Sequence, residues 1–99
     1  MITIVAKLKA IEGKQDELKK SLTTMIAAVK ANEPGVPVYS LHTANDDPTL
    51  FMFYEQYVDA DAQKAHGTTD HMKAFGASLR GVLDGRPQIE AYTQIDGVS

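Results

Sequence analysis

The spacing of apolar residues changes along this chain, and the order of the changes restricts the fold. Residues 2–11 alternate between apolar and polar side chains, which predicts a strand. In residues 14–31 the apolar side chains fall on one helical stripe: Leu18, Leu22, Met25, Ile26 and Val29. The chain therefore begins with a strand and an amphipathic helix, and the sequence NEPG at 32–35 ends that helix.

Two further strands are predicted in the middle of the chain. Residues 36–44 and 49–58 are rich in β-branched and aromatic residues, and NDDP between them is a turn sequence. The second of these strands is apolar on both faces, since alternate side chains point to opposite sides. One face presents Leu50, Met52 and Tyr54, and the other presents Phe51, Phe53 and Tyr57.

The last part of the chain predicts an interrupted helix and one more strand. Asp59 or Asp61 can cap a helix that Gly67 and Thr68 then break. Residues 88–95 alternate again and predict the last strand. Between them, Thr69 can cap a second helical segment, whose apolar stripe consists of Met72, Phe75, Leu79, Val82 and Leu83.

This order of elements indicates an α+β fold of the ferredoxin-like βαββαβ type, with an antiparallel sheet, in one domain spanning residues 1–99. Right-handed crossovers place both helices on one face of the sheet. Each large apolar side chain left on the other face forfeits ~1.5–3 kcal/mol of burial. Because large apolar patches are uncommon on soluble monomers, we expect a homodimer whose sheets face each other. A monomer with partly solvated strands is the alternative.

Composition excludes several classes of function. The net charge of −3 offers no basic surface for nucleic acid or an anionic membrane. The absence of cysteine excludes disulfides, thiolate nucleophiles and cysteine-bound metals. There is no glycine-rich phosphate loop and no apolar run of the roughly 20 residues that span a membrane. With an N-terminus unlike a signal peptide, these features lead us to expect a cytoplasmic protein without a nucleic-acid or membrane partner.

The sequence AHGTTDHMKAF at 65–75 places His66 and His71 five positions apart. On an unbroken helix this spacing separates the two side chains by about 140°, whereas a zinc pair prefers a spacing of four. A metal would also need His42 or Glu55 as a third ligand, so we predict no metal site. Two interpretations stay open: at least one imidazole transfers protons near neutral pH, or both rings have structural roles.

Glu55 lies in the middle of a predicted strand, between apolar residues. On a buried face its carboxylate would need a partner or a raised pKa, which makes it a candidate catalytic residue. The structural alternative is an ion pair with Lys7 or Lys9 on a neighbouring strand, or a contact across the dimer. Three tyrosines on predicted strands could donate hydrogen bonds to a substrate oxygen or simply pack: Tyr39, Tyr54 and Tyr92.

Several segments together resemble the antibiotic biosynthesis monooxygenase (ABM) family: EPG at 33–35, Tyr39, FYEQY at 53–57 and AHGTTDHMKAF at 65–75. The resemblance implies a small dimeric α+β barrel. It also implies one of several activities, since the family includes cofactor-free monooxygenases of phenolic polyketides or quinols and haem-degrading enzymes. A close relative isomerises a phosphorylated autoinducer sugar. The chain departs from these patterns at Asp70, where relatives carry proline, and in lacking the tryptophan of haem-degrading relatives.

From this resemblance we predict a monooxygenase that needs no cofactor, because a phenolic or quinol substrate supplies the electrons. His66 or His71 would remove a proton, and Glu55 is the third expected catalytic residue. The expected substrate-binding residues are Tyr39, Tyr54, Tyr92, Phe75 and Met52. An isomerase of a phosphorylated hydroxyketone would use the same acid–base groups, and a non-catalytic ligand-binding dimer would use the cavity alone.

Overall fold

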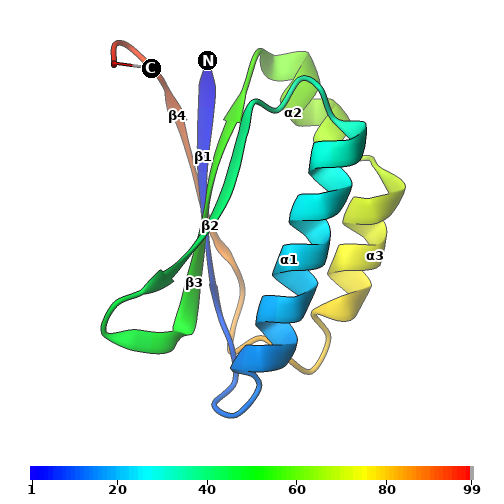
Figure 1. Cartoon of the computed structure of the whole chain (residues 1–99), viewed down its shortest axis with the longest axis vertical. Coiled ribbons are helices and arrows are strands. Elements are labelled where there is room, and N and C mark those ends of the chain that lie inside the picture. Colours follow the sequence, from blue (N-terminus) through cyan, green and yellow to red (C-terminus); the bar gives the residue numbers. More distant parts are fainter. Residues whose placement is uncertain (99) are drawn as a thin grey trace.

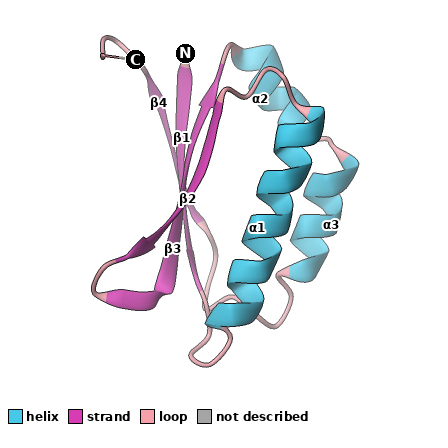
Figure 2. Cartoon of the chain, viewed as in Figure 1, coloured by secondary structure: helices cyan, strands magenta, loops and turns pink. Residues whose placement is uncertain are grey.

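The computed structural model of the chain describes residues 1–98. In that range four strands form one antiparallel sheet, and three helices cover one of its faces (Figures 1 and 2). The elements are β1 (Ile2–Lys9), α1 (Gln15–Asn32), β2 (Val38–Ala44), β3 (Asp47–Tyr57), α2 (Ala60–His66), α3 (Asp70–Ser78) and β4 (Gln88–Thr93). This order confirms the ferredoxin-like prediction, with the second helix of the pattern divided into α2 and α3.

The strands lie in the order β2-β3-β1-β4, and each neighbouring pair is antiparallel. Ala6 of β1, for example, lies opposite Phe53 of β3 and Ile89 of β4. All three helices lie on one side of the sheet (Figure 1), as right-handed crossovers require. We call the sheet face toward the helices the inner face and the opposite one the outer face.

The hydrophobic core fills the space between the inner face and α1. On β3, the side chains of Phe53 and Tyr57 are almost fully buried, whereas Tyr54, on the outer face, is 37% exposed. The alternation predicted for this strand is therefore observed. The helix contributes the predicted stripe, of which Leu18, Leu22, Met25 and Val29 are buried.

The end of α3 differs from the sequence prediction. The helix stops at Ser78, so Val82 and Leu83 do not belong to its apolar stripe. Gly81 adopts a left-handed backbone with φ of 73°, which a helix cannot contain. Val82 is still buried, but from a turn, and Leu83 forms an isolated bridge to Ala10 that needs extended backbone.

Helices α2 and α3 begin at capping residues that the sequence offered, with Asp59 rather than Asp61 as the cap of α2. Asp59 caps α2, with its side chain accepting a hydrogen bond from the backbone N–H of Ala62 at 2.8 Å. Thr69 caps α3 in the same way, at 3.2 Å from the backbone nitrogen of Met72. No helix among residues 1–98 is long and apolar enough to cross a membrane.

Candidate functional site

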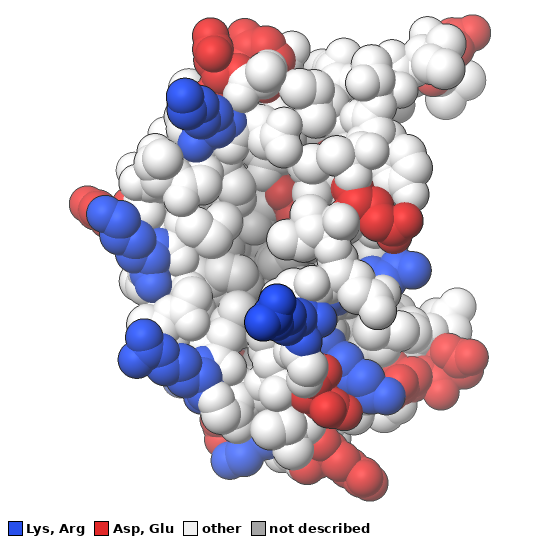
Figure 3. Space-filling model, turned by 180° about the vertical axis from the view of Figure 1, so that it is seen from behind, with Lys and Arg blue, Asp and Glu red and all other residues white. Residues whose placement is uncertain are grey.

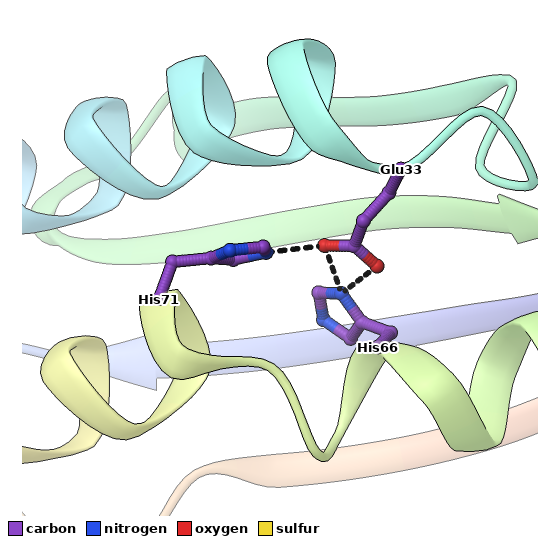
Figure 4. Close-up of side chains that lie close together, drawn as sticks. All are labelled: Glu33, His66 and His71. Atoms are coloured by element: carbon purple, nitrogen blue, oxygen red, sulfur yellow. Dashed lines mark hydrogen bonds and ion pairs between the residues drawn. The ribbon is translucent and has the colours of Figure 1, made fainter.

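Glu33, His66 and His71 meet where α1, α2 and α3 come together (Figure 4). His66 Nδ1 lies 2.9 Å from Oε1 and 3.0 Å from Oε2 of Glu33. His71 Nε2 lies 2.5 Å from the same Oε2. Two imidazoles therefore share one carboxylate, and Oε2 is within hydrogen-bond distance of both rings.

The break between α2 and α3 brings the two rings to one carboxylate. His66 is the last residue of α2, and His71 is the second residue of α3. Thr69 Oγ1 donates to the carbonyl of His66 at 3.0 Å and also caps α3, so it joins the two helix ends. On an unbroken helix a spacing of five would point the rings in different directions.

A tight contact positions Glu33 against α2. Glu33 is the C-cap residue directly after α1, and Gly35 follows it in the loop. A Cβ atom on Gly35 would lie only 2.9 Å from Cβ of Ala62 in α2. The Gly35 carbonyl also accepts a hydrogen bond from the backbone of Val58 at 3.0 Å. Glycine is needed here for close approach, and this approach brings the Glu33 carboxylate to His66.

The cluster is less accessible to solvent at Glu33 and His66 than at His71. The side chains of Glu33 and His66 are 9% and 8% exposed, whereas that of His71 is 19% exposed. A carboxylate at this depth needs hydrogen-bond donors, and the two imidazoles provide them. Because an ionised carboxylate only accepts, each ring presents an N–H to Glu33 and has its second nitrogen for other use.

A cavity of about 340 Å³ lies beside His66, between the inner face of the sheet and helices α2 and α3. Figure 3 shows a recess on this side of the molecule, with mostly uncharged walls and an acidic side chain inside. Among residues 1–98, no lysine or arginine lines the cavity. Its apolar lining includes Ile4, Ala6, Leu8, Phe53, Met72, Phe75, Leu79 and Ile89.

The second nitrogen of His66 opens into this cavity. His66 lines the cavity, and its Nδ1 is held by Glu33. Within the described part of the chain, no hydrogen bond reaches Nε2. Every fully buried side-chain nitrogen or oxygen there has a hydrogen-bond partner, so Nε2 is not fully buried. Nε2 is therefore accessible from the cavity, with a lone pair available when Nδ1 carries the proton.

Glu55 also faces the cavity, where Tyr57 donates a hydrogen bond to its Oε1 at 2.5 Å. Burial raises the pKa of Glu55, an effect that the hydrogen bond from Tyr57 and the charge of His66 partly oppose. The suggested ion pair with Lys7 or Lys9 is wrong, because both lysines lie on the outer face. Lys9 instead lies 3.8 Å from Asp47.

Two more of the predicted residues line the cavity. The ring of Tyr39 stacks on Phe53 with centroids 4.6 Å apart and lies 5.4 Å from the ring of His66. Burial raises the pKa of the Tyr39 hydroxyl, so that it stays protonated and can donate. Phe75 of α3 closes the other side and meets Phe53 edge to face.

The structure does not bring the other predicted substrate-binding residues to this cavity. Met52, Tyr54 and Tyr92 pair with Lys7, Val5 and Thr3 of β1, which are outer-face positions. The two-residue period of a strand points these side chains away from the helices. Tyr54 and Tyr92 are instead 37% and 52% exposed on the outer face.

Glu33 was not among the site residues predicted from the sequence, where it appeared only in the helix stop NEPG and in the segment EPG of the family resemblance. A signal was available, because a carboxylate near the C-terminal end of a helix interacts unfavourably with the helix dipole. Such a residue at the end of α1 calls for another reason for its presence. The imidazoles of His66 and His71 provide that reason.

Glu33, His66 and His71 could also hold a metal, since one donor atom from each lies within 4.8 Å of the others. A carboxylate and two imidazoles form a donor set that zinc accepts. The separations of 2.9 and 2.5 Å, however, are those of hydrogen bonds. Donor atoms of separate residues, each about 2.1 Å from one ion, lie roughly 3 Å or more apart. In this structure hydrogen bonds join the three side chains, whose donor atoms are also the ones that could bind a cation.

Comparison with known proteins assigns this chain to a family. The sequence pattern of the family named Antibiotic biosynthesis monooxygenase (ABM) matches residues 1–78. The chain belongs to the ABM family. The matched part of this ABM protein extends from β1 to the end of α3 and includes Glu33, Glu55, His66 and His71.

Solved structures agree with this assignment. A Caulobacter crescentus CB15 protein that carries the ABM family's name is 38% identical, with a TM-score of 0.91 over 96% of this chain and 90% of that one. PA3566 from Pseudomonas aeruginosa is 26% identical, with a TM-score of 0.88 over 96% of this chain and 94% of that one. Rv0793 from Mycobacterium tuberculosis, at 19% identity, has the same fold, with a TM-score of 0.90 over 99% and 98% of the two chains. No curated protein matches the chain.

Proposed function

We propose that this ABM-family protein is a monooxygenase that oxidises a small phenol or quinol in the cavity beside His66, without a bound cofactor. The family supports the type of reaction. The observation on which the proposal rests is that His66 lines the apolar cavity while its Nδ1 is held by Glu33, which leaves Nε2 as the nitrogen that can meet a substrate. An imidazole in this position can act as a general base near neutral pH.

In the proposed reaction the substrate is the reductant. His66 Nε2 takes the proton of a quinol hydroxyl, and the resulting anion gives one electron to dioxygen. Superoxide and the organic radical combine by forming a C–O bond, which yields a hydroperoxide. Loss of water from the hydroperoxide breaks the O–O bond and leaves a hydroxyquinone. One quinol and one dioxygen thus give one hydroxyquinone and one water, so no other electron donor is needed.

Glu55 and the aromatic residues of the cavity have supporting roles in this proposal. Burial raises the pKa of Glu55, and in its protonated form the carboxyl group can donate a hydrogen bond to the second substrate oxygen. Tyr39 and Phe75 hold the substrate ring and keep water away from it. His71 does not contact the substrate in this proposal, since it does not line this cavity.

The charges around the cavity argue against the isomerase of a phosphorylated hydroxyketone. A phosphate needs basic side chains or free backbone N–H groups. No lysine or arginine among residues 1–98 lines the cavity, and two acidic residues, Glu33 and Glu55, lie beside His66. Asp70 is also in the first turn of α3. A neutral phenolic substrate fits these surroundings better than a phosphate ester.

We also propose that the protein functions as a homodimer formed through the outer face of the sheet. Apolar and aromatic side chains of this face and of the segment after β4 are exposed: Tyr54 (37%), Val58 (50%), Tyr92 (52%), Ile95 (97%) and Val98 (108%). Covering them with a second copy would remove this apolar surface from water. The dimer would also account for the outer-face positions of Met52, Tyr54 and Tyr92.

Oxygen uptake tests the proposal directly. Native protein, treated with a chelator and given no flavin, is mixed with a 1,4-dihydroxy-aromatic, and oxygen consumption and hydroxyquinone formation are measured. His66→Gln should lower kcat/KM about 100- to 10,000-fold, the range for loss of a general base. His42→Gln is the matched control, because His42 lies on the outer face opposite Met52. A quinol that binds but is never oxidised would leave only a ligand-binding protein.

A further inference from the structure

The cavity beside His66 is larger than a single phenol ring needs. Its volume is about 340 Å³, whereas an apolar cavity of about 150 Å³ is enough to bind benzene. Its polar lining gathers at one end, where Tyr39 lies opposite Glu55 in the sheet and Tyr57 donates to Glu55. The ring of His66 lies 5.5 Å from that of Tyr57, and Gln63 is one turn earlier on α2. We call this the polar end, because its groups can bind substrate oxygens.

The opposite end of the cavity is aliphatic. Ile4 pairs with Glu55, and Leu8 lies four residues further along β1 on the same inner face. At about 3.4 Å per residue, Leu8 is roughly 14 Å along the strand from the polar end. The rings of Phe53 and Phe75 lie between, with centroids 6.4 Å apart. The lining beyond these rings, which we call the aliphatic end, consists of Leu8, Leu79, Pro87 and Ile89. A ring bound at the polar end leaves the aliphatic end unfilled.

The cavity opens between α3 and β4. Phe53, Ala6 and Ile89 lie side by side across the inner face, and their exposures rise from 2% and 8% to 67%. None of the residues of α3, Asp70–Ser78, is buried, although Phe75 lines the cavity. A homodimer formed through the outer face would not cover Ile89, which points to the other side of the sheet. A ligand that extends from the cavity to this opening would remove its apolar surface from water.

We propose that the substrate is a quinol that carries a linear alkyl chain, with its ring at the polar end and its chain along the aliphatic end as far as Ile89. This inference rests on the proposed function, which supplies the quinol ring and its contact with His66. The ring packs against the aromatic side chains of Tyr39 and Phe53. The chain packs against Leu8 and Leu79, where each buried methylene adds to the affinity.

The lining of the cavity favours an uncharged and flexible substituent. Among residues 1–98 no lysine or arginine lines the cavity, so an anionic group would lose its hydration there without a partner. The cavity floor also crosses from β3 over β1 to β4, and adjacent strands of a sheet are rotated by roughly 20–25° relative to one another. A flexible chain follows this twisted floor, whereas a flat set of fused rings does not.

The test measures binding and oxidation of a series of 2-alkyl-1,4-dihydroxybenzenes with chains of one to eight carbons. Under argon no oxidation occurs, and calorimetry gives the Kd of each compound for native protein. We expect Kd to fall about fourfold for each added methylene, which corresponds to about 0.8 kcal/mol per buried CH₂. The decrease should stop once the chain passes Ile89 into water. In air, kcat/KM for oxygen uptake should rise in the same order.

Ile89→Gln tests where the chain binds. The substitution places a polar group at the opening, on a side chain that is 67% exposed and so is not needed for the core. We expect the ratio of Kd between the methyl and the longest-chain quinol to fall by about fourfold or more. Ile11→Gln is the matched control and should keep the native ratio, since Ile11 is 41% exposed and does not line the cavity. If Ile89→Gln is unfolded, Leu79→Gln replaces it, with the same expected result.

Three results would overturn the inference: a Kd that does not depend on chain length, a native ratio in folded Ile89→Gln, and tighter binding of a three-ring quinol than of every alkyl quinol. Oxidation of quinols in the same experiments would leave the proposed function standing without it. Chain-dependent binding under argon with no oxygen uptake in air would have the opposite meaning. It would contradict the proposed function and support the aliphatic end as the chain site of a ligand-binding protein.

Discussion

His66 Nδ1 lies 2.9 Å from Glu33 Oε1, although 33 positions separate the two residues in the chain. The contact joins the last residue of α2 to the C-cap residue of α1. It fixes which nitrogen of His66 carries the proton, because the carboxylate can only accept. The nitrogen that remains is the one that opens into the cavity, so Glu33 determines how His66 can act.

Replacing Glu33 with Gln should weaken both stability and activity. The amide has nearly the same shape but no charge, so it binds both imidazoles less strongly. We expect the free energy of unfolding to fall by about 1.5–3 kcal/mol, the range for a hydrogen bond to a charged group. Urea denaturation measures this change, and oxygen uptake measures the loss of activity. Glu17→Gln is the control, since its contact with Lys14 is on the surface and should contribute little.

The stability of the protein should depend on pH through Glu55. Burial raises the pKa of Glu55 in the folded state above its ordinary value of 4.5, so the folded state binds more protons than the unfolded state. This contribution is fully present below pH 4.5 and is lost as the pH rises through the folded pKa. Glu55→Gln should remove the Glu55 contribution to the decrease in the free energy of unfolding as the pH rises. Urea denaturation of both proteins over a pH series measures it, and parallel curves would contradict the assignment.

Removing the hydroxyl of Tyr57 should affect Glu55 specifically. The hydrogen bond at 2.5 Å lowers the pKa of Glu55 and so opposes the effect of burial. Tyr57→Phe retains the ring but leaves a buried carboxyl without this donor, at a cost of about 1–3 kcal/mol. We expect the pKa of Glu55 to rise further, which carboxyl carbon NMR can follow. An unchanged Glu55 titration would show that the hydroxyl does not hold the carboxyl.

Gly35→Ala should destabilise the protein and disturb the Glu33–His66 contact. The added Cβ would lie 2.9 Å from Cβ of Ala62, so the loop must move away from α2. Such overpacking costs about 1–3 kcal/mol. Gly76→Ala is the matched stability control, because Gly76 lies inside α3 and a Cβ added there would meet no atom within 4 Å. There the substitution should stabilise the helix by up to about 1 kcal/mol.

The proposed dimer should depend on the outer face of the sheet. Tyr54→Glu places a charge in the centre of the proposed interface, where it would be buried without a partner. Light scattering after size exclusion should give a dimer mass for native protein and a monomer mass for this variant. Thr23→Glu, on the exposed side of α1, should remain dimeric. Native protein that elutes as a monomer at micromolar concentration would contradict the proposal.

Local spacing in the sequence determined most of the fold. The change from a period of two to a helical period defined the strands and helices. Thr69 marked where α3 begins, and the start of α2 was narrowed to Asp59 or Asp61, of which the structure uses Asp59. Alternation also separated Tyr54 from Phe53 on β3. It did not determine which face receives the helices, because this strand is apolar on both. The positions of Met52, Tyr54 and Tyr92 relative to the cavity therefore required the structure.

The sequence by itself determined the order of the elements, the two faces of each strand and the break that separates His66 from His71, because these depend on neighbouring residues. Only the tertiary structure decided that Glu33 lies between the two imidazoles and that Glu55 faces the cavity. Both depend on the packing of a loop and of helices against a sheet. The two imidazoles lie 33 and 38 positions along the chain from Glu33, and contacts at such separations leave no periodic signal in the sequence.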